Sequence, residues 1–109
     1  KRIEGIFKPG ARVLLVEDLA TDAGSKADFV QALRAAGARV SHAFVVFYYG
    51  IFPEAEQRLK ELDLQLLALA TWWDVLAAAR EGRHFPPATL DQVEAYLRDP
   101  AGWSAARDA

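Results

Sequence analysis

The spacing of apolar residues predicts three strands that alternate with helices. Residues 12–16 form a short apolar run that ends at Glu17 and Asp18, which is typical of a strand covered on both faces. Residues 40–49 are rich in β-branched and aromatic side chains and predict a second strand. Residues 64–70 form a third apolar run; their Leu and Ala content would equally suit a buried helix, and their position after a helix favours a strand.

Helical spacing separates the predicted strands. The first predicted helix begins near Ser25 and Lys26, closes at Gly37, and carries apolar residues three and four apart at Phe29, Val30 and Leu33. The second follows a break at Gly50, has Pro53 in its first turn, and lines one face with Ala55, Leu59 and Leu62. Each strand is therefore followed by a crossover of helical character.

The residues before the first predicted strand and after the third also predict local structure. Residues 2–7 are expected to form an arm that pairs as a hairpin with the first strand through the turn at 8–10. Thr71 and Asp74 have capping-box spacing and predict a short helix through Ala79 that ends near Gly82. Residues 84–87 predict a loop, and residues 89–98 a final helix capped at Thr89 and Gln92. Residues 98–109 are expected to be a helix end and a tail anchored by Trp103.

This alternation predicts an α/β fold with a parallel sheet and right-handed crossovers. A chain of 109 residues fits a single domain over 1–109, with a core segment of about 3–80 and a C-terminal helix and tail of about 84–109. Three or four strands make a small sheet, so we expect a companion half or a partner chain to complete it. The chain lacks Met and begins with Lys1, and we therefore expect either a trimmed chain or the C-terminal part of a longer one.

Composition excludes several classes of function. A net charge of -2 gives no basic field to hold nucleic acid or an anionic membrane. The hydrophobic fraction of 52% argues against disorder and for strands buried on both faces, and the absence of Cys excludes disulfides, thiolate catalysis and Cys-bearing zinc sites. The longest apolar stretch, 43–52, is far shorter than the roughly 20 residues of a membrane span. Without a visible signal peptide, we expect a cytoplasmic location.

The candidate site is the loop that follows the first strand, because ligands of open parallel sheets bind beyond the carboxyl ends of the strands. Glu17 and Asp18 would place two carboxylates at the strand tip, where they could bind sugar hydroxyls or a divalent cation. The small residues Ala23 and Gly24 let backbone amides converge, and the helix beginning near Ser25 favours a phosphate. Ordinary turn and capping chemistry also explains such a loop. Together these features suggest a phosphorylated sugar.

The order of these residues carries a more specific signal. Residues 13–25, VLLVEDLATDAGS, resemble the signature of type I phosphoribosyltransferases, in which four apolar residues, two acids and two mostly apolar residues precede Thr-Thr-Gly-Gly-Thr/Ser. The segments 3–5, 47–55 and 68–76 resemble the orotate phosphoribosyltransferases within that group. The resemblance covers residues 3 to about 80 and matches only the C-terminal half of such an enzyme. It implies the C-terminal part of the type I phosphoribosyltransferase fold, with the N-terminal hood and catalytic loop outside this chain.

The resemblance also implies roles for individual residues. Glu17 and Asp18 would hold the ribose hydroxyls, and residues 21–25 would wrap the 5-phosphate. Thr21 would also lie near the pyrimidine, and Tyr49 stands where many members carry an Arg that meets the orotate carboxylate. Asp22 and Ala23 replace the usual Thr and Gly; we expect Asp22 to turn outward and Lys26 to offset its charge. The implied binding set for phosphoribosyl pyrophosphate is Glu17, Asp18, Leu19, Ala20, Thr21, Asp22, Ala23, Gly24 and Ser25.

The implied activity is transfer of ribose 5-phosphate from phosphoribosyl pyrophosphate to orotate, which gives orotidine 5-phosphate and pyrophosphate in pyrimidine biosynthesis. Mg²⁺ would be carried mainly by the substrate, with no direct protein ligand. The family's catalytic Lys would lie upstream of Lys1, so we expect no catalytic residue here and little activity from these residues alone. The family's shared active sites favour a homodimer.

Two other classes of function are compatible with parts of the sequence. A regulator could keep the sugar-phosphate fold as a sensor of phosphoribosyl pyrophosphate without catalysis. A receiver-type phosphorylation switch is the second alternative, because residues 14–18 also resemble its first strand and acidic pocket. A receiver needs an Asp at the end of a later strand, whereas residues 47–50 are Phe-Tyr-Tyr-Gly, and it needs a Lys-Pro pair that is absent after residue 70. The receiver is therefore the weaker alternative.

Overall fold

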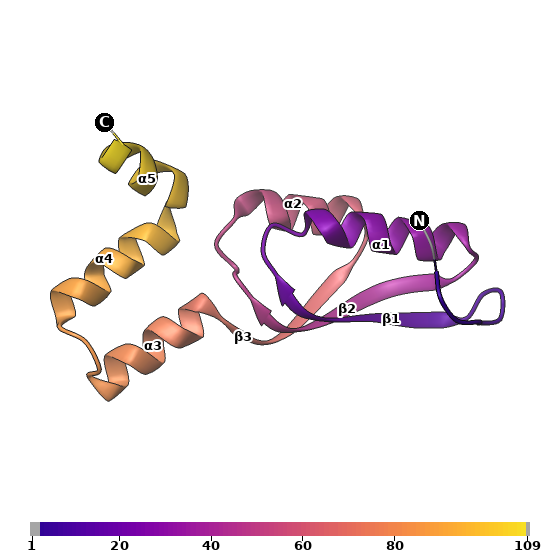
Figure 1. Ribbon diagram of the computed structural model, residues 1–109, viewed down its shortest axis with the longest axis horizontal. Coiled ribbons are helices and arrows are strands. Elements are labelled where there is room, and N and C mark those ends of the chain that lie inside the picture. The colour runs from indigo at the N-terminus through magenta and orange to yellow at the C-terminus, as the bar shows by residue number, and fades with distance from the viewer. Residues whose placement is uncertain (1–2, 109) are drawn as a thin grey trace.

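The computed structural model describes residues 3–108, which form one three-stranded parallel sheet and five helices. The strands β1 (Arg12–Ala20), β2 (Arg39–Tyr48) and β3 (Gln65–Thr71) lie in the order β1-β2-β3. Helix α1 (Gly24–Ala35) connects β1 to β2, helix α2 (Pro53–Glu61) connects β2 to β3, and both cover the same face of the sheet (Figure 1). The predicted α/β alternation is therefore confirmed.

One face of the sheet packs on these two helices. In register, Leu15 of β1, Ala43 of β2 and Leu66 of β3 point toward them and join the core that includes Val30 and Leu59. Gly37, with φ 98°, ends the turn after α1 and sends the chain directly into β2, as the sequence predicted. The sheet and the two helices therefore enclose one apolar core on this side.

The opposite face of the sheet carries apolar side chains without a covering layer among residues 3–108. The prediction that the strands are buried on both faces is therefore wrong for this part of the chain. Continuous apolar runs signal two faces that avoid water, but α1 and α2 can cover only one of them. We call this surface the open face; its apolar residues are Leu14, Val16, Phe44, Val46, Leu67 and Leu69.

Strand β1 is longer at its carboxyl end than the apolar run predicted. It continues through Glu17 and Asp18 to Ala20, because β2 extends far enough to pair with it at Leu19 and Ala20. Backbone pairing does not depend on side-chain polarity, so the ladder passes through the acidic residues. The expectation that these acids follow the strand is wrong, since they lie inside it.

The last three helices form an arm beside the carboxyl ends of the strands (Figure 1). They are α3 (Trp72–Gly82), α4 (Pro87–Arg98) and α5 (Pro100–Asp108). A second apolar cluster, centred on Ile51, Leu76, Leu90 and Leu97, holds the arm to the β2–α2 connection. The radius of gyration is 17.4 Å, against about 13 Å for a compact chain of 100 residues, so residues 3–108 are elongated.

Helices α3, α4 and α5 test the predictions made for the C-terminal part of the chain. The capping box of Thr71 and Asp74 is confirmed. Helix α4 begins at Pro87 without a side-chain cap, so the cap predicted at Thr89 is wrong; a proline suits the first helical position and starts the helix earlier. The predicted tail is helix α5, whose Trp103 ring packs edge-on against Tyr96 with centroids 5.5 Å apart.

The N-terminal arm also differs from its prediction. Residues 3–11 form no strand, so the expected hairpin with β1 is absent from the described residues, and Arg2 lies outside them. The turn itself is present: the Ala11 amide donates to the Lys8 carbonyl at 3.0 Å. Within residues 3–108, no helix has the length and apolar content needed to cross a membrane.

Candidate functional site

The carboxyl ends of all three parallel strands meet at one edge of the sheet, beside the arm (Figure 1). The connection from β1 to α1, which contains the predicted site residues Thr21 to Ser25, lies at this edge. The connection from β2 to α2 and the start of α3 lie there as well. The fold therefore brings the predicted phosphate loop and the aromatic segment around Tyr49 to the same end of the sheet.

The two predicted carboxylates point to opposite faces of β1. Glu17 faces α1, where its Oε2 accepts a hydrogen bond from Lys26 Nζ at 2.5 Å. Lys26 is 1% exposed and also donates to the Leu19 carbonyl at 3.2 Å. Asp18 is exposed on the open side of the strand. Because neighbouring residues of a strand alternate between faces, the structure does not bring the two carboxylates together.

Glu17 and Lys26 form a largely enclosed ion pair. The second carboxylate oxygen of Glu17, Oε1, is buried and has no hydrogen-bond partner among the described residues. The expectation that Lys26 offsets the charge of Asp22 is wrong, because the ammonium lies beneath α1 on Glu17 instead. The pair ties the carboxyl half of β1 to the first turn of α1.

The predicted phosphate loop contains a carboxylate, that of Asp22, which binds the N-terminus of α1. Asp22 Oδ1 accepts a hydrogen bond from the Gly24 amide, the first N–H of α1, at 3.0 Å. Ala23 between them adopts a left-handed conformation with φ 66° and is buried. The Gly24 amide is the main reason that the pKa of Asp22 is lowered, with Arg58 contributing. The expected outward turn of Asp22 is therefore wrong, since its carboxylate faces the helix N-terminus.

Arg58 is a functional candidate that sequence reasoning missed. It lies on α2, and its Nη1 donates to the Asp22 carbonyl at 2.8 Å and lies 3.5 Å from Asp22 Oδ2. Its side chain is 42% exposed, so it can be reached from solvent. Arg58 follows Asp22 by 36 residues, and only the packing of α2 beside α1 brings the two together. No local sequence pattern signals this contact.

Aromatic rings pack against one another where β2 ends and α3 begins. The Tyr49 ring lies 5.7 Å from Trp72, 6.1 Å from Phe47 and 6.2 Å from Phe52 between centroids. Trp73 Nε1 donates to the Gly50 carbonyl at 3.0 Å and fixes the β2–α2 connection against α3. Tyr49 is thereby half-buried in a packed cluster at the edge where the phosphate loop also lies.

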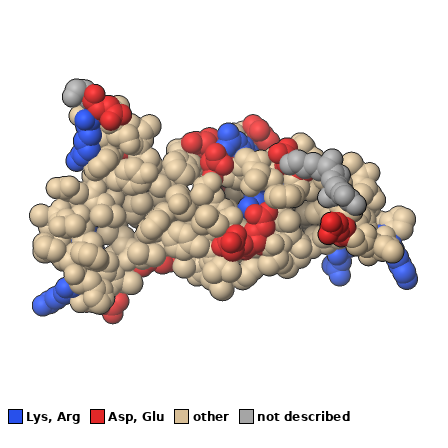
Figure 2. All heavy atoms as spheres, viewed as in Figure 1, with Lys and Arg blue, Asp and Glu red and all other residues tan. Residues whose placement is uncertain are grey.

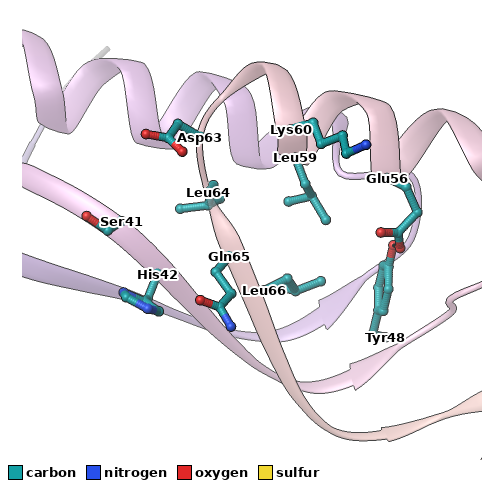
Figure 3. A pocket seen from close by; sticks show the side chains of 10 residues that line it. All are labelled: Ser41, His42, Tyr48, Glu56, Leu59, Lys60, Asp63, Leu64, Gln65 and Leu66. Atoms are coloured by element: carbon teal, nitrogen blue, oxygen red, sulfur yellow. Dashed lines mark hydrogen bonds between the residues drawn. The ribbon is translucent and has the colours of Figure 1, made fainter.

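A separate hollow lies away from this loop, under α2. Figure 3 shows it beneath α2 and along β3, where the Tyr48 hydroxyl donates to Glu56 Oε1 at 2.8 Å. Burial and the Glu56 carboxylate raise the pKa of Tyr48. The hollow of about 570 Å³ contains none of the predicted site residues; its lining is Ser41, His42, Tyr48, Glu56, Leu59, Lys60, Asp63, Leu64, Gln65 and Leu66.

Neither metal ligands nor basic residues gather into an obvious second site. Among residues 3–108, no three His, Asp or Glu side chains are grouped to hold a metal ion. On the face drawn in Figure 2, the Lys and Arg side chains are scattered, and those of the arm lie near its upper and lower ends. The β1–α1 loop with Arg58 is therefore the strongest candidate site that these residues contain.

Comparison with known proteins agrees with the sequence motif. No family model matches the chain. It is 55% identical over 105 residues to an orotate phosphoribosyltransferase of Ruegeria sp. (strain TM1040), covering 96% of this chain and 46% of that protein. It is 55% identical over 106 residues to an orotate phosphoribosyltransferase of Cereibacter sphaeroides (strain KD131), covering 97% of this chain and 46% of that protein. The chain spans about half the length of the curated relatives it matches.

Solved structures give the same result for the fold. The UMP synthase of Leishmania donovani matches with a TM-score of 0.71 and 26% identity, over 86% of this chain and 21% of that protein. The orotate phosphoribosyltransferase of Aeropyrum pernix matches with a TM-score of 0.57 and 31% identity, over 64% of this chain and 41% of that protein. These comparisons confirm the resemblance read from residues 13–25 and the type I phosphoribosyltransferase fold.

Proposed function

We propose that this chain forms the part of an orotate phosphoribosyltransferase that binds the ribose 5-phosphate group of phosphoribosyl pyrophosphate. The observation that carries the proposal is the position of residues 21–25, which match the family's phosphate-binding motif at Thr21, Gly24 and Ser25 and lie at the N-terminus of α1. The complete enzyme would transfer that group to orotate and release pyrophosphate. The 55% identity to proteins bearing the enzyme's name supports this assignment.

Asp18 and Glu17 would have different roles in this proposal. Asp18 is exposed on the open side of β1 and would accept hydrogen bonds from the ribose hydroxyls. Glu17 would reach a hydroxyl only by leaving Lys26, so we assign it first to positioning the end of β1. The phosphate would be bound by amides of residues 21–25, while Leu19 and Ala20 set the spacing between sugar and phosphate.

The chemistry requires stabilisation of positive charge. As the bond between ribose and pyrophosphate breaks, charge builds at the anomeric carbon, and a carboxylate on the adjacent hydroxyls stabilises it electrostatically. Mg²⁺ would enter with the pyrophosphate and ribose oxygens of the substrate and make pyrophosphate a better leaving group. The exposed carboxylate of Asp18 would accept hydrogen bonds from water bound to that cation. No catalytic acid or base is assigned to this chain.

Recognition of the base would involve the aromatic edge of the site. Thr21 is half-buried at the start of the phosphate loop, and Tyr49 lies in the ring cluster at the neighbouring strand end. In this proposal Thr21 faces orotate, and Tyr49 contributes a ring edge at the position where many members of the family carry an Arg. A homodimer would be the working form.

A chimera tests the proposal. The matching 105 residues of the Ruegeria enzyme would be replaced by this chain, and pyrophosphate release would be measured with orotate, phosphoribosyl pyrophosphate and Mg²⁺. We expect activity that depends on all three, and a loss of about tenfold or more in kcat on Asp18→Asn. Glu81→Gln, which removes an exposed carboxylate of α3, serves as the control. A folded chimera without activity would contradict the proposal.

A further inference from the structure

We infer that Asp22 is an internal anion that occupies the phosphate position of the β1–α1 loop, and that Arg58 is the cation it shares with an incoming phosphate. The inference deepens the proposed function and rests on it. It concerns two residues whose side chains meet at the N-terminus of α1 although α2 supplies one of them. It makes Arg58 a phosphate-binding residue and Asp22 its built-in competitor.

The first step concerns the position of the Asp22 carboxylate. Its Oδ1 accepts from the Gly24 amide at 3.0 Å, and its Oδ2 lies 3.5 Å from Arg58 Nη1. A Cβ placed on Gly24 would lie 3.2 Å from Asp22 Oδ1 and 4.0 Å from Arg58 Nη1. Amide, carboxylate and guanidinium therefore converge at one point of the backbone.

The second step compares this carboxylate with a phosphate monoester. Both ligands present anionic oxygens that bind helix N-terminal amides and a guanidinium. The Asp22 carboxylate thus meets two of the groups that the 5-phosphate would use, the Gly24 amide and the Arg58 guanidinium. Two anions at one amide repel each other, so a phosphate can bind there only when the carboxylate moves away. Asp22 and Arg58 are 55% and 42% exposed, which leaves room for this movement.

The third step concerns the contact that holds the β1–α1 loop in place while a phosphate replaces the Asp22 carboxylate. Arg58 Nη1 also donates to the backbone carbonyl of Asp22 at 2.8 Å. That hydrogen bond does not involve the Asp22 carboxylate and can persist when the side chain leaves. The guanidinium then has free N–H groups for the phosphate, because it carries five donors in a planar fork. Arg58 can therefore bind the loop and the ligand at the same time.

Ribose 5-phosphate binding to the chain, measured by titration calorimetry, tests the inference. Asp22→Asn keeps an oxygen for the Gly24 amide but removes the competing charge, so we expect binding about threefold to tenfold tighter. Arg58→Gln removes one charge-assisted hydrogen bond, so we expect binding roughly tenfold weaker. Lys60→Gln, which removes the same charge from α2 on the side of the other hollow, should leave binding unchanged.

A double variant separates direct from indirect action of Arg58. If Arg58 binds the phosphate itself, Arg58→Gln weakens binding in the Asp22→Asn background as well; if it acts only through the charge of the Asp22 carboxylate, the effect disappears there. Circular dichroism shows whether each variant is folded, and Arg58→Lys, which keeps the charge, should restore part of the affinity. Uncharged ribose should gain nothing from Asp22→Asn.

The outcomes distinguish the inference from the proposed function. If neither the unmodified chain nor Asp22→Asn binds ribose 5-phosphate, both the proposed site and the inference are overturned. If the unmodified chain binds but Asp22→Asn fails to tighten binding, the inference is overturned while the proposed function stands. A loss of Arg58 dependence in the double variant equally overturns the direct role of the guanidinium.

Discussion

The ion pair between Glu17 and Lys26 is the most enclosed charged contact among residues 3–108. Removing one member of such a pair leaves the other charge buried without compensation. We expect Lys26→Met to lower the free energy of unfolding by about 3 kcal/mol, measured by urea unfolding. Combining it with Glu17→Leu should recover most of that loss, and a double variant less stable than Lys26→Met would contradict this account.

Asp22 gives a prediction about pH. Its pKa is lowered in the folded chain, chiefly by the Gly24 amide, so its charged form stabilises the fold above the ordinary pKa of 3.8. That contribution is lost as the pH falls through the lower folded pKa. Asp22→Asn should therefore be less stable than the unmodified chain at pH 6, and the difference should vanish in urea titrations at strongly acidic pH. A constant difference at every pH would show that the contact is not ionic.

The limits of sequence reasoning are plain for these same residues. The order of residues 13–25 located the loop and identified the small residues that α1 begins with. It could not show that Glu17 and Asp18 diverge, because their placement depended on how far β2 extends beside β1. Arg58 was missed for a related reason: its contact with Asp22 arises from helix packing and not from spacing along the chain.

Among the elements, α3 ends on a strained residue. Arg83 forms its C-cap with φ 53°, a conformation that costs a non-glycine residue about 1 kcal/mol. Arg83 is exposed and takes no part in the ion pairs that Arg80 makes with Asp91 and Glu94. Arg83→Gly should raise the free energy of unfolding by about 1 kcal/mol, whereas Arg83→Ala, which keeps the strain, should change it little. Destabilisation by glycine would contradict this reading.

Element boundaries were predictable where backbone chemistry sets them. Pro53 starts α2, Gly37 follows the end of α1, and Thr71 caps α3, as their local preferences indicate. The prediction failed where two start signals competed, since Pro87 begins α4 before the cap signal at Thr89. It also failed for α5, whose short apolar pattern becomes a helix face only by packing Trp103 against Tyr96.

Across the whole molecule, the open face is the largest departure from the sequence-based picture. The apolar runs correctly predicted the strands, but no pattern in them could show that α1 and α2 lie on the same side. Val16 and Leu69 are 62% and 70% exposed there. Such a continuous apolar surface is uncommon on a monomer in water. The open face is exposed because α1 and α2 both cover the other face of the sheet, and not because of the residue types that it carries.

The open face gives a prediction for the chain in solution. We expect these 109 residues to bind a hydrophobic fluorescent dye and to self-associate as their concentration rises, measured by sedimentation velocity. Val16→Thr combined with Leu69→Thr should reduce both effects. Val75→Thr, which changes an exposed apolar residue of the arm, is the matched control and should leave them nearly unchanged. A monomer that binds no dye would contradict the exposure of this face.

The most direct test of the central claim is an NMR titration of the nitrogen-15-labelled chain with ribose 5-phosphate. If the β1–α1 loop binds the phosphate, the amide signals of Gly24 and Ser25 should shift in proportion to occupancy. Signals from the hollow beneath α2, such as Gln65, should stay in place. Shifts confined to that hollow, or no shift at Gly24 and Ser25 at saturating ligand, would contradict the account.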